Sequence, residues 1–520
     1  DFEINVPQGN SLQISSIGYK TSTVKIGSQT NLKIVLAEDL NQLEDVVVIG
    51  YGTARKGDLT GSISSVSGSN LTKRSSQQIT SALQGQIAGL QVTRSSGGPG
   101  DSGSIRIRGV TTRSTNDPLI IVDGVPTSTL NDVLASDVET MTVLKDAASA
   151  AIYGSRAAAG VILITTKRAK TYEFALDTPT TRPTNGDAID WLNIQNEIKW
   201  NDGASDPYSM YSQEYINSYM ENNATDPYHY ANTDWVDLML KKTTSHQQHS
   251  LSVTGGTDKL RSKFTFNYQN GKGYYDNRGY ERYAGRVNND YKITDWMRFN
   301  LDFNFSASQS KSPALGNAIY WAYLIAPIYA PYWENGQYAD VKDGGNGLAG
   351  LKEGGISRTN YYKFGGKAQL DITPVKGLTL TAVFSPRYSI TKGKSFKKAV
   401  NVYYEDGRSV LMQSLKTTNL SESRNDSNNM TYQFYANYGN KWGDHSFSAM
   451  VGYEGYKYEW ENLGASRTNY LLDRYPYLNL GPEDYQYNSG SAGHNAYQSV
   501  FGRLMYSYRN KYMIQANIRT

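Results

Sequence analysis

The chain has 520 residues, of which 38% are hydrophobic, and its net charge is only +4. So small a charge on so long a chain gives no support for a nucleic-acid-binding protein. The absence of Cys from the sequence excludes a disulfide framework and thiol catalysis. No apolar run reaches the roughly 18 residues of a transmembrane helix, but the alternating strands of a membrane β-barrel would give a much weaker hydropathy signal.

Short alternating segments begin the chain and continue through residues 1–36, as at Leu12 and Ile14. This pattern predicts a small β-sandwich domain, whose end we assign to residues 1–40. Asp1 already falls within the pattern and no signal peptide is visible. We therefore expect either a cytoplasmic protein or a mature exported protein shown without its start.

The segment EDVVVIGYG, residues 44–52, lies in a linker that we assign to residues 41–52. A β-branched run in a linker can be captured as an extra strand by another protein's sheet edge, because main-chain hydrogen bonds give affinity and alternate side chains give register. The pattern alone favours a simpler interpretation, the last strand of the preceding domain; the segments after residue 52 reverse that preference. The residues of the captured strand would be Asp45, Val46, Val47, Val48 and Ile49.

Residues 53–168 are predicted to form a compact mixed α/β domain. Strand-like runs such as PLIIVDGVP end in Gly or Pro. The Gly-rich run at residues 97–103 is not a phosphate loop, because it lacks a Gly-Lys-Ser/Thr ending and leads into a strand. The helical signal of this domain is a set of apolar residues at three- and four-residue spacing: Ile79, Leu83, Ile87 and Leu90.

Composition changes sharply near residue 170, because only three of the 41 tyrosines and none of the eight tryptophans precede it. From about residue 245 onward, long stretches alternate strictly, as where Phe299, Leu301 and Phe303 stand between polar residues. About ten such strands are visible, several of nine or more residues. Globular strands usually have about five or six residues, and nine to eleven cross a bilayer. With Tyr and Trp at the strand ends, the pattern favours a transmembrane antiparallel β-barrel over residues 171–520; the alternative is a soluble sandwich.

Charged residues gather in the predicted α/β domain. They are either an ordinary solvated surface or, if this domain lies inside a polar barrel, wet and individually weak contacts to the barrel wall. The residues are Arg106, Arg108, Glu139, Lys145 and Arg156.

An aromatic, Pro-interrupted segment lies within the predicted barrel and contains Tyr320, Trp321, Tyr323 and Trp333. It is either an interfacial belt or a loop that stacks sugar rings or peptide side chains. The five His residues show no zinc-site spacing, and no Ser-His-Asp arrangement or nucleophile elbow stands out. An enzyme is therefore unsupported, and we expect no cofactor and no metal.

Several of these segments together resemble one family. QITSALQGQIAGLQVTRSSGGPGDSGSIRIRG, PLIIVDGVP and VETMTVLKDAASAAIYGSRAAAGVILITTK are similar to the plug of SusC/RagA-type TonB-dependent outer-membrane transporters of the Bacteroidetes. EDVVVIGYG resembles the TonB-box region, residues 1–36 resemble the end of a carboxypeptidase-regulatory-like β-domain, and residues 232–275 resemble the early barrel. The family barrel has about 22 strands. We therefore expect the chain to cover roughly half of it, with the C-terminal half and further internal pieces absent.

The resemblance implies active import of a nutrient across the cell outer membrane. Residues 45–49 would bind TonB, which acts with its inner-membrane energising complex, and residues 53–168 would plug the barrel. Expected partners are a SusD-like lipoprotein, outer-membrane lipid and a glycan or peptide ligand, with the aromatic loops favouring oligosaccharide over peptide. The resemblance also allows a dimer of transporter–lipoprotein pairs. The ligand would lie between the aromatic segment and a plug loop that contains Arg113, Asn116 and Asp117.

Two other classes of protein remain open on the sequence alone. A non-transporting outer-membrane receptor or adhesin would use the same barrel as a passive anchor and would give residues 44–52 no role. A secreted soluble β-enzyme would be extracted into buffer without detergent.

Overall fold

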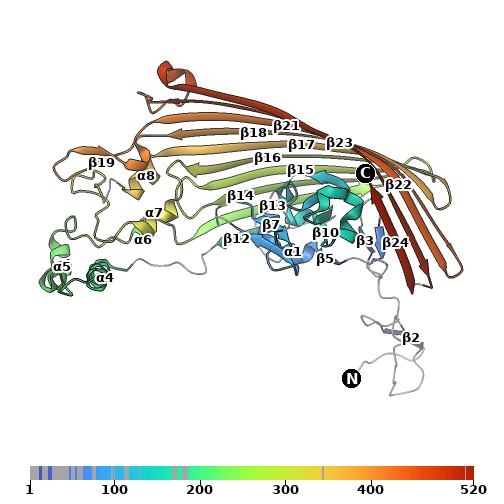
Figure 1. The fold of residues 1–520 in the computed structure, drawn as a ribbon, viewed down its shortest axis with the longest axis horizontal. Coiled ribbons are helices and arrows are strands. Elements are labelled where there is room, and N and C mark those ends of the chain that lie inside the picture. Colours follow the sequence, from blue (N-terminus) through green and yellow to red (C-terminus); the bar gives the residue numbers. More distant parts are fainter. Residues whose placement is uncertain are drawn as a thin grey trace.

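The computed structural model describes residues 11–14, 22–25, 46–48, 53–55, 62–72, 78–94, 98, 100–110, 116–127, 129–166, 172–177, 186–341, 345–509 and 511–520. Its dominant feature is one antiparallel sheet of eleven strands, which curves over a small α/β domain (Figure 1). Within the described part of the chain, no helix has the length and apolar character needed to cross a membrane.

Two short hairpins precede the α/β domain. Strands β1 (Ser11–Ile14) and β2 (Ser22–Lys25) pair with each other, as do β3 (Val46–Val48) and β4 (Thr53–Arg55). The rest of the predicted N-terminal β-domain lies outside the described residues. In Figure 1, β3 lies at the same end of the large sheet as β24.

The α/β domain is built on a five-stranded sheet in the order β5-β10-β11-β8-β9, in which only β11 and β8 are parallel. A separate hairpin joins β6 and β7. The strands are β5 (Ile63–Ser67), β6 (Leu90–Thr93), β7 (Ser104–Ile107), β8 (Leu119–Val122), β9 (Val125–Thr127), β10 (Val138–Leu144) and β11 (Val161–Thr166). The helices are α1 (Gly68–Thr72), α2 (Ile79–Ala82) and α3 (Ala147–Ala150), with 3-10 turns η2 (Leu130–Asp132), η3 (Ala135–Asp137) and η4 (Ala151–Ala157).

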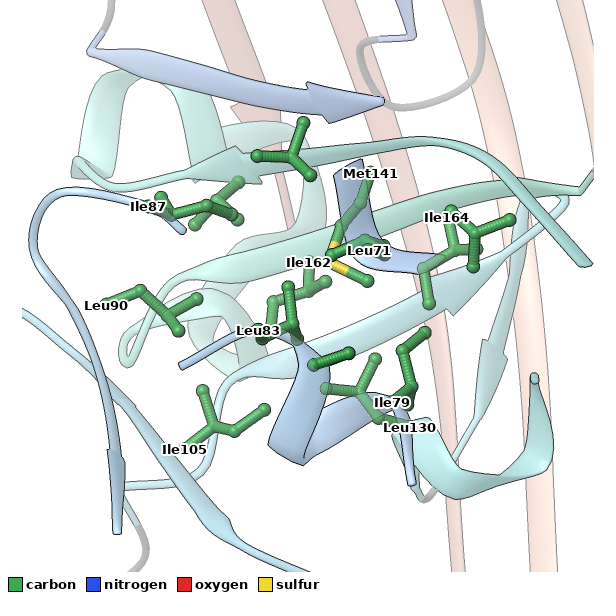
Figure 2. Close-up of a cluster of buried hydrophobic side chains, with 14 of the residues drawn as sticks. Leu71, Ile79, Leu83, Ile87, Leu90, Ile105, Leu130, Met141, Ile162 and Ile164 are labelled. Atoms are coloured by element: carbon green, nitrogen blue, oxygen red, sulfur yellow. The ribbon is translucent and has the colours of Figure 1, made fainter. Parts of the chain in front are cut away.

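The core of this domain contains the apolar residues that carry the helical signal. Ile79, Leu83, Ile87 and Leu90 are all buried, and Figure 2 shows them against Met141 and Ile162 of the sheet. The helix itself ends at Ala82, sooner than the spacing predicts. Gly85 and Gly89 adopt positive φ angles of 77° and 78°, so the chain turns out of the helix while its side chains stay in the core.

The large sheet joins its strands in nearly sequential order, each antiparallel to the next. Long pairings run without a bulge, as from Asn419 opposite Thr468 to Trp442 opposite His445. Its strands are β12 (Tyr172–Asp177), β13 (Thr244–Gly256), β14 (Leu260–Lys272), β15 (Gly279–Lys292), β16 (Met297–Pro313), β17 (Gly355–Val375), β18 (Leu378–Lys397), β21 (Asn419–Trp442), β22 (His445–Thr468), β23 (Gln486–Tyr508) and β24 (Tyr512–Arg519).

The two faces of this sheet differ in polarity. We call the face against the α/β domain the inner face and the other the outer face. Large apolar side chains stand exposed on the outer face, which is what a lipid-facing surface requires. They include Leu251, Val253, Phe264, Leu301, Phe303, Phe364, Leu380, Phe384, Phe434, Val451, Val500 and Leu504. The structure thus has the barrel-type sheet that the alternation predicts, as a partial barrel with eleven strands where the sequence suggested about ten.

The connections between strands are short at one end of the sheet and long at the other. The connections after β13, β15, β17, β21 and β23 have two to four residues, whereas those after β12, β14, β16, β18 and β22, which fall in residues 178–243, 273–278, 314–354, 398–418 and 469–485, have six residues or more. In outer-membrane barrels short turns face the periplasm and long loops the exterior. By this rule the aromatic segment in residues 314–354 is on the exterior side, opposite β3 (Figure 1).

The long loops carry their own secondary structure, which we call the loop cap, and the first, third and fourth of them share a core. Trp235 and Met239 from the first loop pack with Ala318 and Leu348 from the third and with Val402 from the fourth. The elements are α4 (Ala188–Asn201), α5 (Gln213–Thr225), α6 (Trp235–Met239), α7 (Ala318–Leu324), α8 (Gly347–Glu353), β19 (Asn401–Tyr403), β20 (Ser409–Leu411), η6 (Gln413–Leu415), η7 (Leu478–Leu480) and η8 (Glu483–Tyr485). These three loops therefore pack as one unit, whereas α4 and α5 form a separate cluster and η7 packs through Leu478 against Phe396 and Leu420 of the sheet.

Candidate functional site

A fully buried carboxylate joins the α/β domain to the sheet. Glu454, on the inner face of β22, is 0% exposed and accepts hydrogen bonds from Arg156 of η4 and Arg519 of β24, each at 2.8 Å. Gln433 and Tyr497 donate to the same carboxylate at 2.9 and 2.8 Å. Two cations and two neutral donors thus satisfy one buried acid, which is the condition under which such a group is tolerated in a low dielectric.

The arginines at this junction make further contacts with both partners. Arg519 also donates to the Ile152 carbonyl at 2.9 Å. The Arg156 guanidinium lies 4.2 Å from the centre of the Tyr497 ring, within cation–π range. The junction therefore fixes the position of η4 through charge, hydrogen bonding and ring stacking together.

Apolar packing surrounds this charged junction. Ile152 and Tyr153 of η4 belong to one buried cluster with Met450 and Phe501 of the sheet. Gly154 next to them has a φ of 69°, and an added Cβ would lie 3.0 Å from the Arg519 side chain, so only Gly suits this position. From the sequence we expected wet and individually weak contacts between the α/β domain and the sheet. At Glu454 the contact is instead buried.

A second junction lies at the turn between β8 and β9. The Asp123 carboxylate pairs with Arg286 of β15 at 2.9 Å, and its carbonyl accepts from Lys367 of β17 at 2.9 Å. Arg387 of β18 donates to the Pro126 carbonyl at 2.8 Å. Basic side chains from three strands of the large sheet therefore hold the β8–β9 hairpin, through the Asp123 carboxylate and two backbone carbonyls.

A cavity of about 60 Å³ lies beside this second junction, between Asp137 of η3 and the wall residues Arg282, Arg286 and Arg387. Burial raises the pKa of the Asp137 carboxyl, against the opposing effect of the nearby arginines. The volume is large enough for water, so this part of the interface fits the wet contact that we expected.

The five charged residues singled out in the sequence have different roles. Arg156 contacts the sheet, whereas Lys145 donates to Ser64 within the α/β domain at 2.5 Å. Arg106, Arg108 and Glu139 are exposed on that domain and form no hydrogen bond or ion pair with the sheet in the described part of the chain. Only one of the five therefore joins the α/β domain to the described wall.

Above Glu454, toward the long loops, the inner face of β21 to β23 carries no charge. We call this surface the vestibule wall. It presents hydroxyls, amides, glycines and a few aromatic rings: Ser421, Ser423, Asn425, Ser427, Asn429, Tyr456, Tyr458, Trp460, Asn462, Gly464, Ser466, Ser489, Ser491, Gly493, Asn495 and Tyr497. The Trp460 ring lies over Gly493, where an added Cβ would come within 2.7 Å of it. Such a wall suits a neutral, hydroxyl-rich ligand better than a charged one.

The predicted ligand residues of the aromatic segment divide into two kinds. Trp321 packs against the core of the loop cap, and the Trp333 indole donates to the Tyr403 carbonyl at 2.5 Å, so both have structural roles. Tyr320 and Tyr323 are exposed on α7. On the plug loop, Asp117 is exposed and Asn116 half-buried, and Arg113 lies outside the described residues.

Ion pairs also tie the loops of the cap to one another. Asp276 accepts from Lys241 at 2.9 Å and from Lys352 at 2.6 Å, which joins three loops and lowers the pKa of its carboxyl. His229 lies between Asp226 at 2.7 Å and Glu405 at 2.9 Å, one at each ring nitrogen. Since both carboxylates accept, the ring must carry both protons, and these bonds raise the pKa of His229.

Of the strand proposed for capture, Val46, Val47 and Val48 form β3, opposite Arg55, Ala54 and Thr53. Asp45 and Ile49 lie outside the described residues. Sequence reasoning missed Glu454, Arg519, Asp123 and Arg286. In the sequence, these residues are marked only as an acid or base at an inward position of an alternating strand or at a tight turn. That pattern identifies a contact only when the partner residue is known from the structure.

Comparison with known proteins places these features in context. The family model of the TonB-dependent receptor plug domain matches residues 55–161. The chain is 31% identical over 544 residues to TonB-dependent receptor P3 of Formosa agariphila, and 28% identical over 560 residues to TonB-dependent receptor SusC of Bacteroides thetaiotaomicron. Both alignments cover 100% of the chain but 50% and 52% of the relative, so the chain spans about half the length of these curated relatives.

Solved structures share the fold. The RagAB peptide importer in its open-open state matches with a TM-score of 0.73 and 24% identity, covering 91% of this chain and 56% of that one. The unliganded ferric citrate transporter FecA matches with a TM-score of 0.50 and 11% identity, over 89% and 59% of the two chains. At these identities the likeness concerns architecture, a plug domain against a barrel wall.

Replacing Glu454 with Gln should loosen η4 from the sheet. The substitution keeps the size of the side chain but leaves Arg156 and Arg519 without a counter-ion, which costs on the order of 3–5 kcal/mol for a buried pair. Hydrogen exchange of the amides in residues 152–157 should accelerate accordingly. Glu459→Gln, on the outer face of the same strand, is the matched control; equal exchange in the two variants would contradict the role of the junction.

The contact between His229 and Glu405 should depend on pH. Because the pKa of His229 is raised above its ordinary 6.5, the stabilisation is complete below that value and is lost as the pH rises through the higher folded value. The hydrogen-exchange protection factors of residues 398–418, which are corrected for the intrinsic pH dependence of amide exchange, should then fall by roughly twofold to fivefold, as for an exposed ion pair. His229→Gln should remove this pH dependence; a pH profile that persists in the variant would exclude His229 as its source.

Proposed function

Because the chain belongs to the SusC/RagA-type TonB-dependent transporters, we propose that it forms the plug and part of the barrel of an active nutrient importer in the cell outer membrane. The observation that carries the proposal is the α/β domain, the plug, held against the inner face of a lipid-facing sheet by a buried junction at Glu454 and a half-buried one at Asp123. A plug held so firmly requires energy for its release. The exposed apolar outer face supports the location in the membrane.

Residues 45–49 would receive that energy from TonB. Strand β3 pairs with β4 on one side only among the described residues, so its other edge suits a strand added by a partner. It lies at the short-turn end of the sheet, which corresponds to the periplasmic side (Figure 1). TonB and its inner-membrane energising complex would therefore pull from the side away from the ligand.

A pull on β3 has a short route to the Glu454 junction. β4 leads to β5, the edge strand of the plug sheet. The start of β5 is bonded to two residues just ahead of α3: the Ser62 N–H donates to Asp146, and Lys145 donates to Ser64. From Asp146 the chain runs through α3 into η4, which carries Arg156. Stripping β5 from the sheet edge would thus disturb the segment that holds Glu454.

The ligand would enter from the long-loop side and meet the vestibule wall. Its uncharged hydroxyl and amide groups, with Tyr458 and Trp460 between them, favour a neutral oligosaccharide over a peptide, whose termini are charged. A SusD-like lipoprotein would close this side, seated on the loop cap, and a pair of such complexes fits the family pattern. RagAB, which shares the fold, is a peptide importer, so the substrate class is a property to be tested for this chain.

Replacing Val47 with Pro should abolish uptake while the protein still reaches the outer membrane. Proline removes a backbone donor from β3 and fixes φ, so an added strand could not pair there. Growth on the transported nutrient measures the effect, with Val47→Thr as a control that keeps a β-branched strand residue. Normal growth of the proline variant would support the non-transporting receptor instead.

Replacing Trp460 with Ala should weaken ligand binding by the purified full-length transporter, by roughly threefold to tenfold for the loss of one stacking ring. Calorimetry with a panel of neutral oligosaccharides, acidic oligosaccharides and peptides identifies the ligand class. Tyr453→Ala, on the outer face of the same strand, is the control and should bind normally. If only peptides bind and Trp460→Ala has no effect, the vestibule wall is not the ligand surface.

A further inference from the structure

A row of cations crosses three neighbouring strands on the outer face of the sheet. Lys311 of β16 lies directly opposite Arg358 of β17, and Arg358 lies directly opposite Lys394 of β18. Lys392, two residues before Lys394, points to the same face. We call Lys311, Arg358, Lys392 and Lys394 the basic row. On the other side of Lys311 the neighbouring position is Gly279, which has no side chain.

This row stands above the apolar band, on the side of the long loops. Along β17 the outer-face positions pass from Phe364 through Tyr362 and Asn360 to Arg358. Phe364 is 45% exposed and lies opposite Phe305 of β16 in the same register. The side chains change from hydrocarbon to cation within a few alternations, so the row lies at the level where lipid headgroups replace acyl chains.

The charges in this row are not balanced as they are on neighbouring strands. Lys394 pairs with Glu422 at 2.8 Å, whereas Lys311 and Arg358 form no ion pair with any described residue. Cations farther along the same face do have partners: Arg424 pairs with Asp426 at 2.8 Å, and Lys457 with Glu459 at 2.7 Å. Like charges directly opposite each other destabilise a sheet, so an anion from outside the chain would stabilise the arrangement at β16–β18.

We propose that the basic row binds the phosphate headgroup of an outer-leaflet lipid. The Arg358 guanidinium offers a planar fork for two phosphate oxygens, and Lys311 and Lys392 flank it as point charges. Below them the acyl chains would lie on Phe364 and its neighbours. Above, the Tyr477 ring lies 5.2 Å from Lys394, so loop 469–485 bounds the site on its outer side. A free phosphate would use the cations alone, whereas a phospholipid uses the cations and the apolar band together.

The test uses the full-length protein, purified in detergent and stripped of lipid. One variant combines Lys311→Gln, Arg358→Gln and Lys392→Gln; a matched control combines Lys272→Gln, Lys441→Gln and Lys457→Gln and loses the same charge outside the row. Binding of phosphatidic acid and of phosphatidylcholine is measured by native mass spectrometry. Each basic side chain near an anionic headgroup strengthens binding several-fold, so the first variant should bind phosphatidic acid at least about tenfold more weakly.

The control should retain the affinity of the original protein, and phosphatidylcholine should bind all three proteins equally. Equal losses in the two triple variants would show a general effect of net charge and would overturn the site. Displacement of phosphatidic acid by an equimolar amount of inorganic phosphate would show a phosphate site that does not use the apolar band, and would also overturn it. Thermal unfolding of each variant, compared with the original protein, separates loss of binding from loss of fold.

Discussion

Inside a bilayer, each backbone N–H and C=O of a strand has to bond to a neighbouring strand, because hydrocarbon offers no other partner. The large sheet meets this constraint with pairings that run unbroken along its longest strands, as between β21 and β22. Because a continuous register keeps every second side chain on the same face, one condition on the backbone sorts the residues of β13–β24 into an apolar outer surface and a polar inner one. The plug contacts, the vestibule wall and the basic row all depend on that sorting.

The inner surface changes character along the strands. Where the plug touches the wall, bases from β15, β17 and β18 meet Asp123 and the carbonyl of Pro126, and the acid Glu454 meets Arg156. Beyond the plug, the wall of β21–β23 carries only neutral polar groups and rings. On the inner face of these strands, charged side chains are thus concentrated where the sheet contacts the plug. A surface of this kind can bond to hydroxyls without leaving an unpaired ion buried.

The Glu454 junction carries an energetic penalty for opening that a wet interface lacks. Separating it exposes a buried acid and two guanidiniums together with the apolar surface of Tyr153 and Phe501, and partial opening leaves charges uncompensated in a low dielectric. Such an interface is stable until it is broken as a whole, which is consistent with the proposed release of the plug by an external pull. The cavity beside Asp137 shows that the remaining contact area is less tightly filled.

The sequence by itself determined the alternation of the barrel strands, the α/β nature of the plug and the identity of its core, since Ile79, Leu83, Ile87 and Leu90 are all buried. Burial follows from hydrophobicity and spacing, which are local. The sequence could not determine that Arg156 meets Glu454, because 298 residues separate them and only the pairing of many strands brings them together. The assignment of Trp321 and Trp333 to a ligand site stays a prediction, and the structure adds their packing and hydrogen bonding among the long loops, which depends on which loops touch. The opposition of Lys311 and Arg358 likewise exists only in the register of two strands, which is a property of the tertiary structure.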